Sequence, residues 1–144
     1  MKKEGGPRSP CVRPVHEDWG QEDPGLRKVN LAEKLSQFTD LWRPRVVGAL
    51  NGQEVKLAKL AGEFVSHRHE NEDELFLVLA GHLTIHLRDG SIELDPGEFV
   101  IIPRGTEHRP IATGEVHVLL FEPASTLNTG NLRNERTVDA PERI

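Results

Sequence analysis

The sequence lacks the features that mark proteins outside the reducing interior of a cell. It has one cysteine, Cys11, so no disulfide can form within the chain, which is typical of a reducing compartment. No apolar run approaches the about 18 residues that a membrane-spanning helix needs. The N-terminus, MKKEGGPRSP, has a charged start but no apolar segment typical of a secretory signal. We therefore expect a cytoplasmic protein.

An excess of positive charge is also missing. The net charge is −5 and the isoelectric point is about 5.8, with no visible basic patch. This composition argues against nucleic acid and anionic membranes as partners. The 144 residues, 36% of them hydrophobic and 28% charged, are enough for one domain with a real core.

The two ends of the chain differ in composition from its middle. Residues 1–28 are rich in proline, glycine and charge, which predicts a flexible N-terminal extension; a partner-binding arm that uses Trp19 is the alternative. Asn30 is a good helix cap with Glu33 three residues later, which predicts a short amphipathic helix over 31–39. Residues 124–144 are polar, and we expect a C-terminal arm that wraps the domain or frays.

Residues 29–123 form the predicted domain, because strand patterns and turn signals alternate along most of it. Asn51-Gly52 is a strong hairpin signal, and Asp89-Gly90 marks another turn. Many short strands at regular spacing predict an all-β barrel or sandwich. The predicted strands are 46–50, 54–60, 64–69, 74–79, 83–87, 91–94, 99–102, 109–112 and 115–121.

Four residues have the chemistry of a metal site. His67 and His69 are two apart, so on a strand both imidazoles lie on the same face. Glu74 opens the next apolar strand, and His108 follows a Pro-Arg-Gly turn. Buried without partners these groups would be costly, whereas three imidazoles and one carboxylate suit a first-row divalent metal. Surface histidines near an acidic turn are the alternative.

The segment from Gly62 resembles the first motif of the cupin superfamily. That motif reads Gly, a spacer, His-x-His, three or four residues, Glu, six residues and Gly. The matching residues here are Gly62, His67, His69, Glu74 and Gly81. The spacer after Gly62 has four residues where five is usual.

The segment from Gly97 resembles the second cupin motif. That motif reads Gly, five residues, Pro-x-Gly, two residues, His, three residues and Asn. Here Gly97, Pro103, Gly105 and His108 match, but Ala112 stands in place of the terminal Asn. Neither departure removes a metal ligand. Asp73 could compete with Glu74, but the spacing to the last glycine of the first motif favours Glu74.

The resemblance implies a single jelly-roll barrel with one divalent metal ion inside: iron, manganese, nickel, cobalt or zinc. It does not imply one reaction, because cupins include dioxygenases, isomerases, decarboxylases and binding proteins. We expect a metal-dependent enzyme acting on a small polar metabolite, such as a sugar, a keto or enediol acid, or a catechol-like ring. A non-catalytic ligand-binding module is the alternative, and a mannose-6-phosphate isomerase-like enzyme is a minor one. The catalytic residues are not identified by sequence.

Other polar residues have weaker claims to a role. Arg104 either holds an anionic substrate over the barrel mouth or is a solvated turn residue. His82 and His86 are predicted to face solvent, and His117 to be a satisfied strand histidine. Lys56 and Lys59 lie on opposite faces of one predicted strand, so at most one of them points inward.

The strand that begins at Glu74 is apolar on its other face too, through Leu75, Leu77 and Leu79. A strand that is apolar on both faces is usually covered on both. We therefore expect a homodimer built on this face, with covering by an arm of the same chain as the competing possibility.

Overall fold

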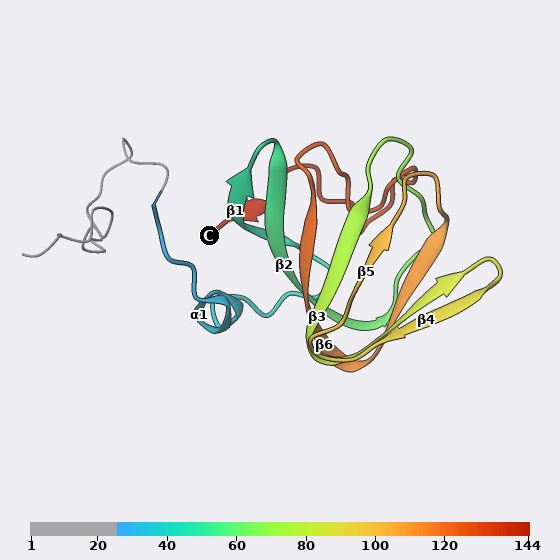
Figure 1. The fold of residues 1–144 in the computed structure, drawn as a ribbon, viewed down its shortest axis with the longest axis horizontal. Helices are drawn as coiled ribbons and strands as arrows, with labels where there is room; N and C mark the ends of the chain where they lie inside the picture. The colour runs from blue at the N-terminus through green and yellow to red at the C-terminus, as the bar shows by residue number, and fades with distance from the viewer. Residues whose placement is uncertain (1–25) are drawn as a thin grey trace, which may run out of the picture.

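The fold was analysed in a computed structural model that describes residues 26–144. The proposals for Cys11 and Trp19, and most of the predicted N-terminal extension, lie outside the described residues. Within them the regular secondary structure is nearly all strand and forms one curled sheet beside a single short helix (Figure 1). The helix is not long enough to span a membrane.

Helix α1 covers only Leu31–Leu35, so the prediction of a helix over 31–39 was too long. Its predicted start is confirmed, since the side chain of Asn30 accepts a hydrogen bond of 3.0 Å from the backbone of Glu33. The helix ends early because the hydroxyl of Ser36 donates to the carbonyl of Glu33, a local bond that competes with further helix. The chain beyond it places Phe38 against β2.

Seven strands follow in the described part of the chain, and two of them each join two predicted strands. The residues predicted as 74–79 and 83–87 form one strand, and those predicted as 109–112 and 115–121 form another. The strands are β1 (Arg45–Leu50), β2 (Gln53–Glu63), β3 (Glu74–Leu87), β4 (Gly90–Leu94), β5 (Phe99–Ile102), β6 (His108–Pro123) and β7 (Glu142–Arg143). The predicted strand over 64–69 is wrong, because that segment is irregular apart from one bridge at His67.

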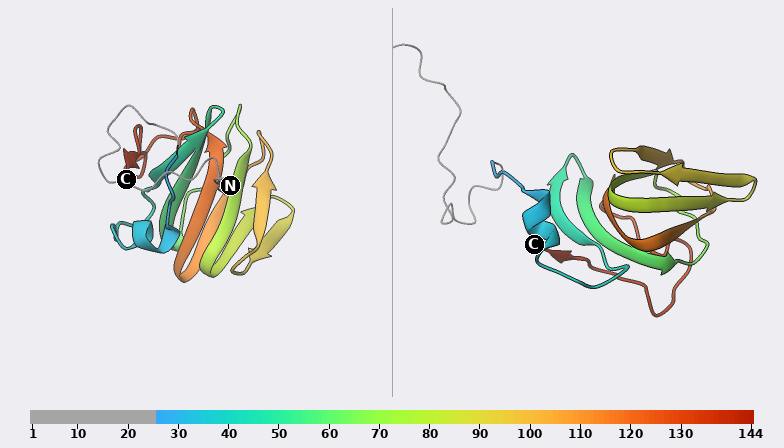
Figure 2. Two further views of the ribbon diagram at one scale, coloured as in Figure 1. Left: turned by 60° about the vertical axis from the view of Figure 1, so that its left-hand side comes forward. Right: turned by 90° about the horizontal axis from the view of Figure 1, so that it is seen from below.

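The long strands β3 and β6 pair with each other and hold the sheet together. The hydrogen-bonded order is β4-β3-β6-β2-β1-β7, and β5 pairs with the first part of β3. Register shifts between Val78 and His82 mark a bend in β3, and Figure 2 shows the sheet as a whole strongly curled. Gly81 sits at this bend with φ of 84°, where a Cβ would lie 2.7 Å from the carbonyl of Glu115. The bend therefore requires glycine.

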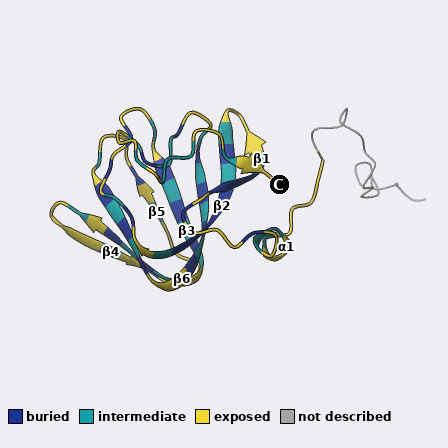
Figure 3. Ribbon diagram, turned by 180° about the vertical axis from the view of Figure 1, so that it is seen from behind, coloured by how far each residue is buried: buried dark blue, intermediate teal, exposed yellow. Residues whose placement is uncertain are grey.

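The inside of the curled sheet is the hydrophobic core. Alternate residues of β3 and β6 point inward, and Figure 3 shows buried and more exposed residues alternating along these strands. Val78, Leu83, Ile85, Val116 and Val118 are fully buried. The β1–β2 hairpin completes the jelly roll. Its turn residues, Asn51 and Gly52, both have the positive φ that the hairpin prediction requires.

The C-terminal arm wraps the barrel, which decides between the two possibilities that the sequence left open. Its end forms β7, which pairs in parallel with β1, and the backbone of Ile144 bonds to Val46. Midway along the arm, Thr129 is completely buried. The arm is therefore part of the folded domain.

Candidate metal centre

The four residues predicted as metal ligands come together inside the barrel. His67 and His69 lie on the irregular segment between β2 and β3, Glu74 is the first residue of β3, and His108 is the first of β6. All four are buried, and one ligand atom from each lies within 4.8 Å of the others. Three separate parts of the chain thus converge on one point. The group is positioned for a metal ion, and its role as a ligand set stays a prediction.

The backbone places His67 and His108 directly opposite each other. Each donates its N–H to the carbonyl of the other, at 3.0 and 2.8 Å, which makes an isolated antiparallel bridge. This bridge keeps the alternation that the strand prediction relied on: His67 and His69 are buried while Arg68 between them is exposed. The prediction of a shared face was right although the strand itself was not.

Two of the imidazoles are held in the tautomer that metal binding needs. Nδ1 of His67 lies 2.9 Å from the carbonyl of Val65, and Nδ1 of His108 lies 2.9 Å from the carbonyl of Thr106. A carbonyl can only accept, so each Nδ1 carries the hydrogen and each Nε2 keeps its lone pair. Such bonds to the far nitrogen are typical of metal-ligating histidines.

The third imidazole has no hydrogen-bond partner among the described residues. Both ring nitrogens of His69 are buried and unbonded, although Nε2 lies 3.3 Å from Oε1 of Glu74. Nε2 of His108 lies at the same distance from that oxygen. A buried nitrogen without a partner costs free energy that a bound metal ion would recover. The residues present therefore fit a divalent metal.

Burial keeps His67 neutral. Loss of water and the neighbouring His108 lower the pKa of His67 from 6.5 to about 4, against the attraction of Glu74. A metal ligand must offer a free lone pair, so a neutral imidazole at neutral pH is ready to bind.

Behind Glu74 lies a second buried carboxyl group, Glu122 on β6. Burial opposes ionisation of Glu74, but the neighbouring Glu122 carboxyl group and the nearby imidazoles of His108 and His69 outweigh it and hold the pKa of Glu74 well below its usual range. Burial and the adjacent Glu74 carboxylate raise the pKa of Glu122 well above its usual range, which favours the protonated form of Glu122. Glu74 is thereby kept ionised and facing the imidazoles.

Lys56 of β2 supplies a positive charge to this carboxyl pair. Its Nζ lies 2.9 Å from Oε1 of Glu122 and 3.8 Å from Oε1 of Glu54, and its side chain is only 2% exposed. Of the two β2 lysines, Lys56 points inward, while Lys59 bonds to the carbonyl of Phe38 on the outside.

Glu122 was not among the residues predicted from the sequence. The alternation along β6 could have indicated it, because Glu122 continues the inward row of Val118 and Leu120.

The remaining polar residues lie away from the centre. Asp73 is exposed and accepts a 2.8 Å bond from the backbone of Arg104, so the preference for Glu74 over Asp73 agrees with the structure. The side chain of Arg104 is paired with Asp73 and 64% exposed, as expected for a solvated turn residue. His82 bonds to acidic residues of β4 and its following turn, and His117 lies 2.9 Å from Glu115.

The C-terminal arm touches the centre, a contact that the sequence did not predict. Gly130 packs so closely that a Cβ there would lie 2.3 Å from the carbonyl of Arg68 and 2.9 Å from the ring of His67. Asn131 and Arg68 exchange two hydrogen bonds of 2.9 Å. The arm therefore fixes the segment that carries both histidines. Its contact depends on a glycine with φ of 59°, which no short-range pattern reveals.

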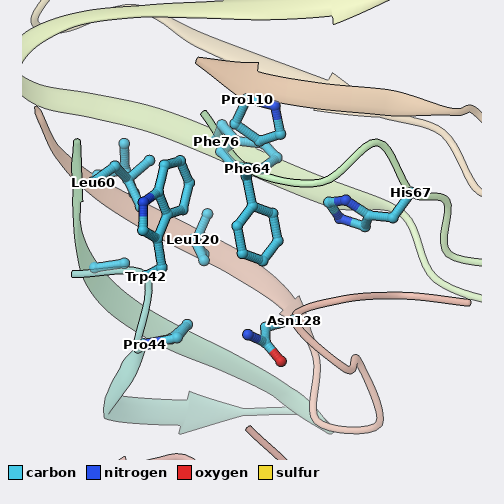
Figure 4. Close-up of a pocket in the computed structure, with 11 residues that line it drawn as sticks. Trp42, Pro44, Leu60, Phe64, His67, Phe76, Pro110, Leu120 and Asn128 are labelled. Carbon is cyan, nitrogen blue, oxygen red and sulfur yellow. The ribbon is translucent and has the colours of Figure 1, made fainter. Parts of the chain in front are cut away.

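An apolar cavity of about 40 Å³ adjoins the centre (Figure 4). His67 belongs to the metal centre and also lines the cavity, and most of the other lining residues are aromatic or aliphatic. Trp42 and Phe64 stack with ring centroids 4.7 Å apart, and the ring of Phe64 meets His67 edge-on at 5.5 Å. Phe76 also lines the cavity, whereas Val65 does not.

Comparisons with known proteins agree with the fold and the motifs. The sequence pattern of the Cupin domain family (Cupin_2) matches residues 53–122. The uncharacterized protein YdbB of Bacillus subtilis (strain 168) is 39% identical over 64 residues, which are 44% of this chain and 57% of that protein. The match thus spans little more than half of that relative.

Two solved structures are similar over a larger part. Protein NMB1881 of Neisseria meningitidis is 25% identical, with a TM-score of 0.63 over 68% of this chain and 100% of its own. A cupin-2 domain protein of Shewanella frigidimarina is 43% identical, with a TM-score of 0.65 over 66% of this chain and 93% of its own. Because a cupin-2 protein aligns over nearly its whole length at that level of identity, this chain belongs to the cupin superfamily.

Proposed function

We propose that the protein binds one divalent metal ion through His67, His69, Glu74 and His108 and is an enzyme acting on a small oxygen-bearing metabolite. The observation that carries the proposal is the convergence of four buried ligand atoms, one of them on an imidazole with no other partner. Four protein ligands leave open positions on a six-coordinate ion. A bound metal would supply Lewis-acid activation of a chelating oxygen group.

The chain's own residues would orient the ligands and exclude water. The carbonyls of Val65 and Thr106 fix two imidazoles, and Glu122 fixes the carboxylate of Glu74. The apolar walls beside His67 keep the interior dry, which strengthens electrostatic effects there. Iron, manganese, nickel, cobalt and zinc remain the candidate metals.

A non-catalytic binding module is the second candidate. It is favoured by the cavity lining, where His67 and Asn128 are the polar side chains, and the amide of Asn128 is committed to backbone groups of the C-terminal arm. Such a lining offers no evident proton acceptor for catalysis. No lining residue is Lys or Arg, which weakens the mannose-6-phosphate isomerase-like alternative, because a phosphate favours a cationic partner.

Metal content of the purified protein tests the proposal. We expect one metal per wild-type chain after loading and dialysis, and loss of it in the double variant His67→Ala, His69→Ala. The variant His82→Ala, which removes an exposed histidine, is the matched control and should retain the metal. Wild-type stoichiometry in the double variant would contradict the ligand assignment. Screening keto acids, enediols, sugars and catechols with each metal, with and without oxygen, then separates enzyme from binding module by turnover.

We also propose that two copies pair through the outer face of the sheet. Phe99 and Ile101 of β5 are 60% and 54% exposed, and they pair with Leu77 and Leu75 of β3. The face continues onto Phe121 of β6 and presents apolar rather than charged groups, as the centres of protein interfaces do. Analytical ultracentrifugation should show a dimer at tens of micromolar and a monomer for Ile101→Lys. A wild-type monomer would refute the pairing.

A further inference from the structure

The cavity beside the metal centre limits what the ligand can be. It adjoins the centre, because the ring of His67 lines it and Phe76, another lining residue, meets the ring of His108 edge-on at 6.1 Å. A molecule held by oxygen atoms at the centre would reach this cavity past the ring of His67, which Figure 4 shows at its wall. The groups it meets there are the indole of Trp42, the ring of Phe64 and aliphatic side chains of β2 and β6.

The polar atoms around the cavity are already bonded within the protein. Nε1 of Trp42 donates to the carbonyl of Ala61 at 2.9 Å. The amide of Asn128 donates to the carbonyl of Arg136 and accepts from the backbone of Val138, both at 2.8 Å. Nδ1 of His67 is held by a backbone carbonyl. A hydroxyl group placed in this cavity would lose its hydrogen bonds to water and gain none to the protein, which costs binding free energy.

The cavity is small, which limits the size of the buried group. Its volume of about 40 Å³ is enough for about three water-sized spheres. The stack of Trp42 on Phe64 forms one wall, and the guanidinium of Arg136 lies over both rings at 5.8 and 5.7 Å from their centroids. The stacking and the contact with Arg136 therefore hold this wall in place, and a large ring would have to displace it.

We propose that the ligand is a 2-oxo or 2-hydroxy acid with a short aliphatic side chain. Its oxygen atoms chelate the metal and its alkyl group fills the cavity between Phe64 and Phe76. This inference rests on the proposed metal site and narrows its ligand from polar metabolites in general to chelators with one apolar end. Sugars are excluded as good ligands because each hydroxyl beyond the chelating pair would be buried without a partner.

Hydroxamates test the inference, because they keep one chelating head while the tail is varied. The cobalt-loaded protein is titrated with aceto-, propiono- and butyrohydroxamate and with the dihydroxylated glycerohydroxamate, and binding is followed by the visible spectrum of cobalt. We expect affinity to rise roughly fourfold per added methylene, as burial of each predicts. Glycerohydroxamate should bind no better than acetohydroxamate. A flat alkyl series, or tighter binding of the hydroxylated tail, would overturn the inference.

The variant Ala58→Val fills the cavity from β2, where Ala58 is 1% exposed. It should reduce the gain from aceto- to butyrohydroxamate to less than twofold while the affinity for acetohydroxamate and for the metal stays unchanged. Ala49→Val makes the same change at an exposed position of β1 and should leave the whole series as in wild type. An unchanged gain in Ala58→Val would place the tail elsewhere and refute the proposed cavity.

The wild-type series decides the question even if Ala58→Val does not fold. Failure of the wild-type protein to take up metal would refute the proposed function as well. Uptake of one metal together with a flat series would refute only the ligand class.

Discussion

Two groups of buried polar side chains lie side by side in this barrel, and they are satisfied to different degrees. Around Lys56, Nζ meets Oε1 of Glu122 and lies near Oε1 of Glu54, and one atom, Oε2 of Glu122, has no bond within the described residues. Around His69, two buried ring nitrogens have no bond at all within the described residues. The charged atoms of the first group are mostly paired as the chain folds, whereas the second group leaves both nitrogens of one imidazole unpaired.

The contrast separates buried polar residues that support a site from those that bind at it. Both groups are expensive to bury, and cost alone would not distinguish them. Glu74 belongs to both, since one side of its carboxyl group meets Glu122 and Oε1 faces the imidazoles. The four predictions below test whether the two groups respond differently to mutation, pH and metal.

The largest effect is expected at Lys56. Lys56→Met leaves the carboxyl groups of Glu74 and Glu122 without their buried counter-charge, which should lower the free energy of unfolding of the metal-free protein by about 3–5 kcal/mol. Denaturant titration measures it. The loss should be smaller in the metal-loaded protein, because the ion also compensates Glu74. Adding Glu122→Gln to Lys56→Met should recover part of the stability; equal losses with and without metal would contradict the coupling.

A smaller effect is expected from the pH dependence of the metal-free protein. The pKa of His67 is 6.5 in the unfolded chain and about 4 in the fold, so between these values the unfolded state binds more protons. Stability therefore falls as the pH drops from 6.5 towards 4, by about 3 kcal/mol from this group. Urea titrations across this range should show a shallower slope for His67→Gln. Identical slopes in the two proteins would contradict the assignment.

Gly130 tests the contact between the arm and the centre. Gly130→Ala should cost about 2–3 kcal/mol, from the left-handed backbone and from the close approach to His67 and Arg68. Because the change pushes on His67, metal affinity should also fall about tenfold. Gly114→Ala is the matched control: its φ is 72° but nothing lies within 4 Å, so only stability should change. Equal metal affinities in the two variants would show that the contact of the arm does not influence metal binding.

The smallest effect is expected at Arg104. Its guanidinium is exposed and paired with Asp73 rather than with the centre. Arg104→Ala should leave both the metal affinity and the affinity for acetohydroxamate unchanged, with little change in melting temperature. A clear loss of hydroxamate affinity would instead support the alternative in which Arg104 holds an anionic substrate over the barrel mouth.

Much of the site was predictable because its signals are short-range. The His67–His69 spacing, the charged start of the apolar β3 and the turn before His108 are read from neighbouring residues, and the structure brings all four side chains together. The helix start at Asn30 and the hairpin at Asn51-Gly52 depend on local backbone preferences in the same way. The end of the helix was misread because a local bond from Ser36 to Glu33 competes with further helix. The irregular path through His67 was misread because a tertiary contact with His108 overrides the local pattern.

By itself, the sequence determined the all-β class and the four candidate ligands, since both follow from spacing or alternation within a few residues, and its two motifs resemble those of the cupin superfamily. Only the tertiary structure placed Glu122 and Lys56 behind Glu74, Gly130 against His67 and the Trp42–Phe64 stack beside the centre. These contacts join residues far apart in the chain. Their partners are chosen by the curl of the sheet and by the path of the arm, which depend on the packing of the whole barrel and on no local pattern.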